Sequence, residues 1–589
     1  MNPKATFISI ILCIAGLNVT FAQNNYDFYK QKYPSWFSDA KLGIFIHYGV
    51  YSVPSWSGAE QYAEWFYKGL IGGDTARENF QRRVYGDDFR YEDYKGLFRS
   101  ELFNADEWAA LFAESGAKYV IFTSKHHDGF CMWDDSLSGT WNSVHSPCKI
   151  DFCRQLSQAC RKKNLKFGLY YSLLEWNNPL FRWTVDSAGL ERYVKDYMQP
   201  QFKSLVQKFK PDLLFADGDW DFSPRQLGSE DLVQYYYDMV GAEGIVNNRW
   251  GVGFDYGYLT PEYSSGISEL KRPWAECRGL SRSFGLNRNA DLSSYMTGEE
   301  LILHFVSLVA AGGGLTLNVA PSADGQIPLL QQERLLDLGK WLKTNGEAIY
   351  GAKPCKDAAA YYTAEEAYEN DTVINYDWVR NAPKKGMPED NFGVKWYGYI
   401  IPKYSEEYTI YLKADDMAYL NINELYYEGM AGDTTLKMIL CDSAFTHKPL
   451  KTTIRLKKDI PYLFNLLYEE KDLNASVSLQ WESRHRPKES VKGNWHKTYW
   501  WIKPTSYLTQ KGNDLYVMAD LNYSDDQTAV SLPKAPKENM QITCLDTENM
   551  YFLWQYKDGK LMIDTSNLKF GKIKSKGVVV FKLEGYLQD

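Results

Sequence analysis

A carboxylate at the end of a buried strand is the first feature of this chain that suggests chemistry. The apolar run Leu213–Ala216 is typical of a buried strand, and Asp217 and Gly218 follow it directly. Side chains alternate along a strand, so Asp217 shares a face with Phe215. This places Asp217 at the carboxyl end of a buried strand, where barrel enzymes carry their catalytic groups. The stretch alone is equally consistent with a loop acid that caps the following turn.

Hydrolysis of a glycosidic bond needs a second carboxyl group, which protonates the departing oxygen and then activates water. We expect this group on a later loop, where Glu262, Glu269 and Glu276 are the candidates. Their positions alone do not choose among them. If Asp217 acts as a nucleophile, the two carboxyl groups must lie about 5–5.5 Å apart.

Other expected strands also end in residues that could bind or react. These ends are Ile46-His47-Tyr48, Ser124–Asp128, Tyr170-Tyr171-Ser172 and Asn247–Trp250. The carboxyl ends of parallel strands meet at one rim of a barrel, so we expect one site there. The cluster His126-His127-Asp128 resembles a set of metal ligands. Adjacent side chains on a strand point to opposite faces, however, so the two histidines cannot easily bind one metal ion. Nucleophile-elbow and glycine-rich phosphate motifs are absent from the sequence, which leaves paired-carboxylate chemistry.

The elements that must position these side chains alternate between strands and helices from Lys41 to about Tyr350. This pattern predicts a (β/α)8-like, TIM-type barrel with six visible strands and room for two more. A capping box formed by Thr297 and Glu300 predicts one helix start. The expected strands are 42–47, 118–123, 166–171, 212–217, 244–248 and 315–319, and the expected helices are 105–114, 151–163, 192–209 and 298–311.

From about Tyr361 onward the chain consists of short alternating strands, which predict two all-β sandwich domains after the barrel. The fold class is therefore multidomain, α/β plus all-β. The predicted domains are a catalytic barrel over 23–352, an inserted β-sandwich module over 365–485 and a C-terminal β-sandwich over 490–589. Strands from 353–364 are further candidates for the C-terminal domain.

Composition and the N-terminus bear on partners and location. A formal net charge of -8 without a long basic run argues against nucleic acid and anionic membranes as partners. The apolar run Phe7–Leu17, followed by Thr20-Phe21-Ala22, predicts a cleaved signal peptide over residues 1–22. The run is too short to span a bilayer, so we expect export to the periplasm or the outside of the cell.

Cys153 and Cys160 share one helix face and are expected to be free, buried thiols.

The barrel region resembles glycoside hydrolase family 29, the retaining α-L-fucosidases. The resemblance covers about residues 30–352, and its motifs occur in order with family-like spacing. The chain departs from the family at Phe215, where Trp is frequent, and at Asn248, where Asp is frequent. The matching stretches are 41–49, 62–65, 117–120, 125–130, 167–172, 247–251, 283–289 and 314–321, followed by Asp324-Gly325.

The resemblance implies a role for each matched residue. Asp217 would be the nucleophile, and Glu262, in Thr260-Pro261-Glu262-Tyr263, would be the acid/base, with Glu276 as the second choice. Phe284 would contact the methyl group of fucose. The hydroxyl groups of the sugar would be bound by His47, Glu64, Trp65, His126, His127, Tyr170 and Arg249. The implied activity is exo-acting removal of terminal α-L-fucose from a fucosylated oligosaccharide or glycoconjugate, without a catalytic cofactor.

The inserted module resembles the protective-antigen type of β-sandwich, through Val394–Pro402, Glu407–Asp416, Tyr419–Ile422 and Ser478–Trp481. In that family paired acids at the position of Asp415-Asp416 hold Ca²⁺, which prefers oxygen ligands. Met417 stands where Gly is common in the family, so a solvated acidic turn is the alternative.

Two rival functions remain open on the sequence. One is a fucose-binding lectin or adhesin with a degenerate barrel, although both carboxylates are present. The other is a glycosidase for a related sugar such as galactose. Turnover of aryl fucosides and aryl galactosides separates these functions.

Overall fold

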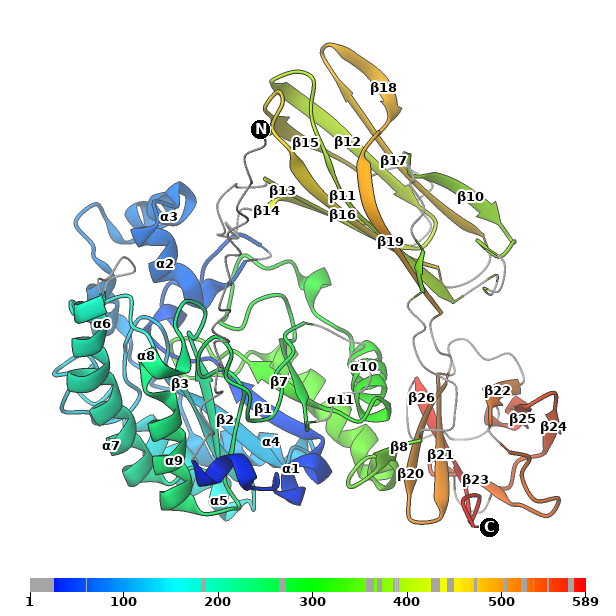
Figure 1. The fold of residues 1–589 in the computed structure, drawn as a ribbon, viewed down its shortest axis with the longest axis horizontal. Helices are drawn as coiled ribbons and strands as arrows, with labels where there is room; N and C mark the ends of the chain where they lie inside the picture. The colour runs from blue at the N-terminus through cyan, green and yellow to red at the C-terminus, as the bar shows by residue number, and fades with distance from the viewer. Residues whose placement is uncertain are drawn as a thin grey trace, which may run out of the picture.

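The computed structural model consists of a barrel and two β-domains (Figure 1). The predicted signal peptide and Glu269 fall outside the described part of the chain. The structure describes residues 26–588 except 60, 182–186, 264–271, 356–364, 368–372, 385–386, 388, 390, 425–434, 442–449, 471–473, 503–505, 521–526, 533, 548–549 and 570–576.

Seven parallel strands form the sheet of the barrel, in the order β5-β4-β3-β2-β1-β7-β6. All positions from Leu42 to Ile46 in β1 are buried, because one face points into the barrel and the other contacts the surrounding helices. All six predicted strands are present. The strands are β1 (Leu42–Ile46), β2 (Tyr119–Lys125), β3 (Lys166–Ser172), β4 (Leu213–Asp217), β5 (Ile245–Val246), β6 (Ala275–Gly279) and β7 (Gly314–Val319).

An irregular segment, residues 258–262, fills the remaining position between β5 and β6. Single parallel bridges join Asn247 to Tyr258, Leu259 to Trp274, and Glu262 to Cys277. The barrel is thus completed by β6 and by a segment too irregular to be a regular strand. These are the two positions for which the predicted pattern left room.

Helices surround the barrel, and side chains cap the starts of several of them. Asp151 accepts a hydrogen bond from the backbone N–H of Arg154 at the start of α5, and the capping box of Thr297 and Glu300 is present at the start of α10. The helices are α1 (Ser35–Ala40), α2 (Phe66–Ile71), α3 (Thr75–Tyr85), α4 (Ala105–Glu114), α5 (Phe152–Lys162), α6 (Ser187–Arg192), α7 (Gln199–Phe209), α8 (Pro224–Leu227), α9 (Ser229–Val240), α10 (Gly298–Ala310) and α11 (Leu329–Asn345).

The helix predicted over 192–209 is interrupted by a π-helical segment, Tyr193–Met198, between α6 and α7. Pro200 occupies the first turn of α7 and has no N–H to donate to the preceding turn. A local π-helical turn accommodates this missing hydrogen bond. In such a turn each carbonyl accepts from the N–H five residues later, where an α-helix uses the N–H four residues later.

The inserted module is a sandwich of two antiparallel sheets with a core of its own. Along β16 buried and partly exposed residues alternate, so one face of the strand packs against the opposite sheet. One sheet contains β10 (Asn375–Val379), β12 (Glu406–Ala414), β15 (Leu450–Leu456), β17 (Ala475–Ser483) and β18 (Arg486–Ser490). The other contains β9 (Glu365–Ala367), β11 (Phe392–Ile400), β13 (Met417–Glu424), β14 (Thr435–Cys441), β16 (Tyr462–Glu470) and β19 (Asn494–Ile502).

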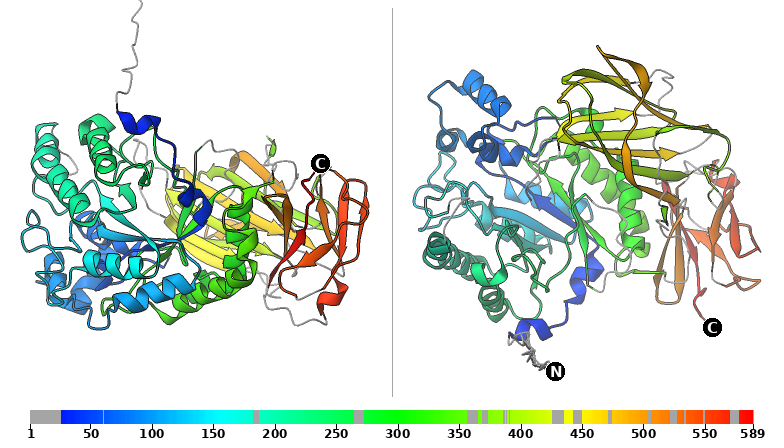
Figure 2. Two further views of the ribbon diagram at one scale, coloured as in Figure 1. Left: turned by 90° about the horizontal axis from the view of Figure 1, so that it is seen from below. Right: turned by 45° about the horizontal axis from the view of Figure 1, so that its top comes forward.

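The C-terminal domain packs against α10 and α11, as Figure 2 shows. Trp341 on α11 donates its indole N–H to the carbonyl of Val578 at 2.8 Å, and side chains of this domain join the barrel's core. Its strands are β8 (Lys353–Pro354), β20 (Ser506–Lys511), β21 (Asp514–Asp520), β22 (Gln527–Ser531), β23 (Ile542–Cys544), β24 (Trp554–Lys557), β25 (Lys560–Asp564) and β26 (Val578–Leu583).

Strand pairing fixes where the module enters and leaves the chain. β8 pairs with β20, so the module interrupts the C-terminal domain between these two strands. β18 and β19 pair within the module, which therefore extends beyond the predicted end at residue 485, as far as Ile502. The alternation of β19 alone does not reveal to which of two neighbouring β-domains the strand belongs.

Cys153 and Cys160 on α5 are buried free thiols, as predicted. Free thiols are also found at Cys131, Cys148, Cys277, Cys355 and Cys544. Within the described ranges, no helix combines the length and the apolar character needed to cross a bilayer.

Candidate active site

A cavity of about 190 Å³ opens at the carboxyl ends of the barrel strands. It brings together nearly all the residues that the sequence analysis assigned to a site. Those lining it are His47, Glu64, Trp65, His126, Tyr170, Asp217, Arg249, Glu262 and Phe284. His127 lies behind Asp217 instead of at the cavity wall, and Glu276 lies elsewhere.

Asp217 is held as an ionised carboxylate by three neighbours. Its Oδ2 accepts the hydroxyl hydrogen of Tyr170 at 2.8 Å and lies 3.5 Å from Nε2 of His127. Its Oδ1 accepts a hydrogen bond from Arg249 at 3.3 Å. Burial by itself raises the pKa of Asp217, but His127, the Arg249 charge and Tyr170 together hold this pKa well below its ordinary value. The carboxylate is therefore charged at any pH near neutrality.

Glu262 lies on the irregular segment that completes the barrel. It accepts hydrogen bonds from the hydroxyl of Tyr62 at 2.6 Å and from Arg249 at 3.0 Å. Arg249 therefore contacts both carboxylates. The side chain of Glu262 is 28% exposed, against 12% for Asp217, so Glu262 is the one with access to water.

Glu276 points away from the cavity. It lies on β6 next to Cys277, which lines the cavity, and neighbouring side chains on a strand face opposite sides. Its carboxylate is fully buried against His304 of α10. The placement therefore favours Glu262 over Glu276.

Glu64 is a buried acid in the cavity wall. It accepts hydrogen bonds from the backbone N–H of Gly285 at 2.6 Å and from the hydroxyl of Ser283 at 3.2 Å. Burial raises its pKa to about 7, against the opposing effect of these donors. A Cβ atom at Gly285 would lie 2.9 Å from the backbone nitrogen of Glu64, so only glycine allows this close approach.

Two histidines present neutral rings to the cavity. Nδ1 of His47 lies 2.7 Å from Oδ1 of Asn318, whose amide N–H donates to the carbonyl of Phe284. This orientation places the ring hydrogen of His47 on Nδ1 and leaves Nε2 as an acceptor. Burial lowers the pKa of His47 to about 4, and it also holds the pKa of His126 well below its ordinary value. Within the described chain, the buried Nδ1 of His126 has no hydrogen-bond partner, as expected of a group that binds a ligand hydroxyl.

Aromatic rings form the rest of the wall. Phe284 packs on His47, with 4.9 Å between ring centres, and Phe215 lies under the guanidinium of Arg249 at 5.3 Å. Sequence reasoning missed Tyr62 and Trp220, which also line the cavity. Tyr62 begins the matched stretch that contains Glu64, and Trp220 follows Asp217 by three residues. Their closeness in the sequence to these residues was the signal that could have identified both as site residues.

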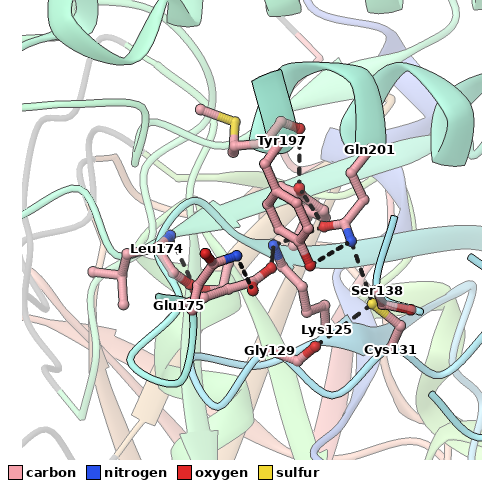
Figure 3. A network of polar contacts seen from close by, with 12 residues as sticks. Lys125, Gly129, Cys131, Ser138, Leu174, Glu175, Tyr197 and Gln201 are labelled. Carbon is pink, nitrogen blue, oxygen red and sulfur yellow. Dashed lines mark hydrogen bonds and ion pairs between the residues drawn. The ribbon is translucent and has the colours of Figure 1, made fainter. Parts of the chain in front are cut away.

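A buried ion pair supports the loops behind this wall (Figure 3). Nζ of Lys125, at the end of β2, lies 2.6 Å from Oε1 of Glu175, and both side chains are nearly inaccessible. Lys125 also donates to Gln201 at 2.9 Å, which joins α7 to the network. Lys125 immediately precedes His126, and Glu175 immediately precedes Trp176, which packs on His127. The ion pair thus holds two loops of the site in position.

The acidic turn of the inserted module has its own hydrogen bonds. Oδ1 of Asp415 accepts from the hydroxyl of Tyr468 at 2.8 Å and from the backbone N–H of Ser476 at 2.9 Å. Burial, together with the nearby Asp416 and Asp415 charges, raises the pKa of Glu470 to about 9, so this acid carries a proton. In the described ranges, no group of three or more His, Cys, Asp or Glu side chains is arranged to hold a metal ion. As placed, the turn does not fit Ca²⁺, and calcium binding stays a prediction.

Comparisons with known proteins agree with this geometry. Residues 13–347 match the family model described as alpha-L-fucosidase, and residues 350–495 match that of the PA14 domain. The rat (Rattus norvegicus) plasma alpha-L-fucosidase is 37% identical over 378 residues, which cover 62% of this chain and 78% of the relative. The human (Homo sapiens) tissue alpha-L-fucosidase is 38% identical over 365 residues, covering 60% and 77%.

Solved structures resemble the chain over most of its length. The Thermotoga maritima alpha-fucosidase in complex with a mechanism-based inhibitor has a TM-score of 0.61 and 25% identity, covering 94% of this chain and 97% of that structure. The same enzyme in complex with fucose has a TM-score of 0.60 and 25% identity, covering 94% and 98%.

Proposed function

This chain belongs to the alpha-L-fucosidase family, and we propose that it removes terminal α-L-fucose by double displacement, with Asp217 as nucleophile and Glu262 as acid/base. The chain is a glycoside hydrolase that acts on fucosyl residues. The observation that carries the residue assignment is Arg249, which contacts Asp217 at 3.3 Å and Glu262 at 3.0 Å at the mouth of one cavity. A single guanidinium thus holds together the two carboxyl groups that the reaction needs.

The first step forms a bond from Asp217 to the anomeric carbon as the glycosidic oxygen leaves. The proton of Glu262 goes to that oxygen, so the leaving sugar departs as a neutral alcohol. In the second step Glu262 takes a proton from water, and the resulting hydroxide displaces Asp217 from the same carbon. Two inversions give net retention.

The remaining residues explain the choice of sugar. Glu64, His47 and His126 are buried hydrogen-bonding groups that a correctly placed hydroxyl would satisfy. A sugar with a displaced hydroxyl leaves them unpaired, which is penalised far more than a missing methyl contact. Phe284 supplies an apolar surface for the methyl group of fucose.

Turnover of an aryl α-L-fucoside tests the assignment of the nucleophile. The Asp217→Ala protein should lose nearly all activity on this substrate while keeping the wild-type melting temperature. An aryl galactoside serves as the comparison, and faster turnover of it by wild-type protein would refute the fucosidase assignment. Wild-type protein that binds fucose without turnover would identify a lectin.

Rescue by azide tests the assignment of the acid/base. On an activated aryl fucoside the Glu262→Ala protein still forms the glycosyl-enzyme, and a small anion can then replace the missing base. Azide should therefore raise its turnover, and the same addition to Glu276→Ala should change little. Rescue of Glu276→Ala alone would move the role to Glu276.

We also propose that the protein is exported to the periplasm or the outside of the cell. The support is the apolar run Phe7–Leu17 with small residues at the cleavage positions. Mass spectrometry of protein purified from its native host tests this, because a cleaved leader gives a mature chain that starts near Gln23.

A further inference from the structure

One face of the inserted module is lined with tyrosines and polar groups. In the sheet that contains β11, β13 and β16, alternate residues such as Trp396, Leu420 and Leu466 form the core of the module. The residues between them point away from that core. We call these residues the outer sheet face: Lys395, Tyr397, Tyr399, Tyr419, Asn465 and Leu467.

Strand pairing makes the outer sheet face continuous. Tyr397 on β11 is the direct neighbour of Asn465 on β16, and Leu467 on β16 lies between Lys395 and Tyr419. Side chains opposite each other on adjacent strands are about 4.5–5.5 Å apart at their Cβ atoms. The rings, the amide and the ammonium group therefore form one surface and not scattered positions.

This face meets the barrel beside the catalytic cavity. The guanidinium carbon of Arg282 lies 5.4 Å from the centre of the Tyr419 ring. Arg282 stands between Ser281 and Ser283, both of which are buried in the barrel. Phe284, two residues further on, lines the cavity. Figure 1 shows β13 and β14 as the strands of the module that lie nearest the barrel.

The cavity has room for the fucose ring and little more. Its volume of about 190 Å³ compares with roughly 150 Å³ for a cavity that accommodates one benzene molecule. Further sugars of a fucosylated chain must therefore lie outside the cavity, among the surfaces around its mouth. The outer sheet face is one of these surfaces.

The chemistry of the outer sheet face suits sugars. Aromatic rings pack against the apolar faces of sugar rings, and Tyr397 is 38% exposed, which leaves its ring accessible. Oδ1 of Asn465 is buried and has no hydrogen-bond partner in the described part of the structure. An unpartnered amide oxygen beside an accessible tyrosine ring is a polar group that a sugar hydroxyl can satisfy.

From these observations we infer that the outer sheet face binds the sugars on the leaving-group side of the fucosyl bond. The inference rests on the proposed fucosidase activity and adds to it the substrate class: fucosylated oligosaccharides, in preference to small fucosides. The module then acts as part of the substrate-binding site of the barrel and not as an independent adhesive domain.

The test compares two substrates for each protein, a fucosylated oligosaccharide of three or more sugars and 4-nitrophenyl α-L-fucoside. The measured quantity is the ratio of kcat/KM for the oligosaccharide to kcat/KM for the aryl fucoside. In Tyr397→Ala and Tyr419→Ala this ratio should fall about fivefold to tenfold, which is the range expected for one lost aromatic contact. If Tyr419→Ala melts early, Tyr419→Leu removes the ring while keeping an apolar side chain.

Tyr411→Ala is the matched control. Tyr411 is a partly exposed tyrosine on β12, in the opposite sheet of the same module, where it bonds to Glu482. Its loss should leave the ratio unchanged. An unchanged ratio in the Tyr397 and Tyr419 variants, or an equal fall in Tyr411→Ala, would overturn the inference and leave the fucosidase assignment intact. Wild-type protein that cleaves neither substrate would overturn both.

Discussion

Arg249 is the residue that connects the two halves of the proposed chemistry. Its guanidinium carries hydrogen bonds to Asp217 and to Glu262, while Phe215 packs beneath it. Because the same cation contacts both carboxylates, the charge on each influences the other through it. A lysine at this position could not reach both acids in this planar, two-sided geometry.

Glu64 provides a prediction about pH. Its pKa is raised to about 7, so the carboxylate is protonated below that value and ionised above it. An ionised Glu64 accepts hydrogen bonds from sugar hydroxyls, so kcat/KM should rise with an apparent pKa near 7. In Glu64→Gln this ionisation should disappear from the profile. Persistence of the step near pH 7 in Glu64→Gln would assign it to another group.

Residue types in the matched stretches were predictable, but most of the distances between them were not. The position of Asp217 follows from the strand that precedes it, and the family resemblance supplied Glu262, Glu64 and the histidines. No local pattern shows that Arg249 contacts both acids, because that contact joins three segments separate in sequence. Tyr62 and Trp220 were not predicted as site residues, because nothing in their residue types distinguishes them from other aromatic residues. Only the fold places them at the cavity.

At the level of elements, the irregular segment 258–262 gives Glu262 its position. Tyr263, the next residue, has a φ of 45°, which turns the chain, and its hydroxyl donates to the carbonyl of Ser281 at 3.0 Å. The segment lacks an apolar run, so periodicity could not reveal it. β6 was missed for a similar reason, because Ala275–Gly279 contains two charged residues among five. Elements with clear alternation or caps were placed correctly, as α4 and α10 illustrate.

The ion pair between Lys125 and Glu175 should be needed for the stability of the barrel. Replacing Glu175 with Gln leaves the buried ammonium of Lys125 without a compensating charge, at a cost of about 3–5 kcal/mol. The midpoint of urea unfolding, followed by circular dichroism, should therefore fall clearly. The double variant Lys125→Met/Glu175→Gln removes the charge as well and should recover part of the loss. Equal midpoints for Glu175→Gln and wild type would contradict the role given to this pair.

Considered as a whole, the molecule has a separate core in each β-domain, but part of the C-terminal domain also packs into the core of the barrel. Tyr516, Met518 and Val580 of the C-terminal domain belong to the same hydrophobic cluster as the barrel helices, whereas the inserted module has a separate one. The sequence predicts a barrel, an inserted module and a C-terminal domain. Which of these parts pack together depends on contacts between segments that are distant in the sequence, and the sequence pattern does not reveal such contacts.

Thermal unfolding should therefore show two transitions, one for the barrel with the C-terminal domain and one for the module. The module's transition should also depend on pH. The pKa of Glu470 is raised to about 9 in the folded state, so its stabilising effect is full below the ordinary glutamate pKa of about 4.3 and is lost as pH rises through 9. In calorimetry the module's melting temperature should fall between pH 5 and pH 9, and Glu470→Gln should flatten that fall. A single pH-independent transition would contradict this account.

The central claim, that Asp217 forms a covalent bond to fucose, can be tested by trapping. A 2-fluoro fucoside with a good leaving group slows both steps, but its first step still proceeds, so the glycosyl-enzyme accumulates. After proteolysis, mass spectrometry should find one fluorofucosyl group per chain, attached to Asp217 within residues 211–221, and none in Asp217→Ala. A label on a different carboxylate, or inactivation without any label, would contradict the assignment of Asp217 as the nucleophile.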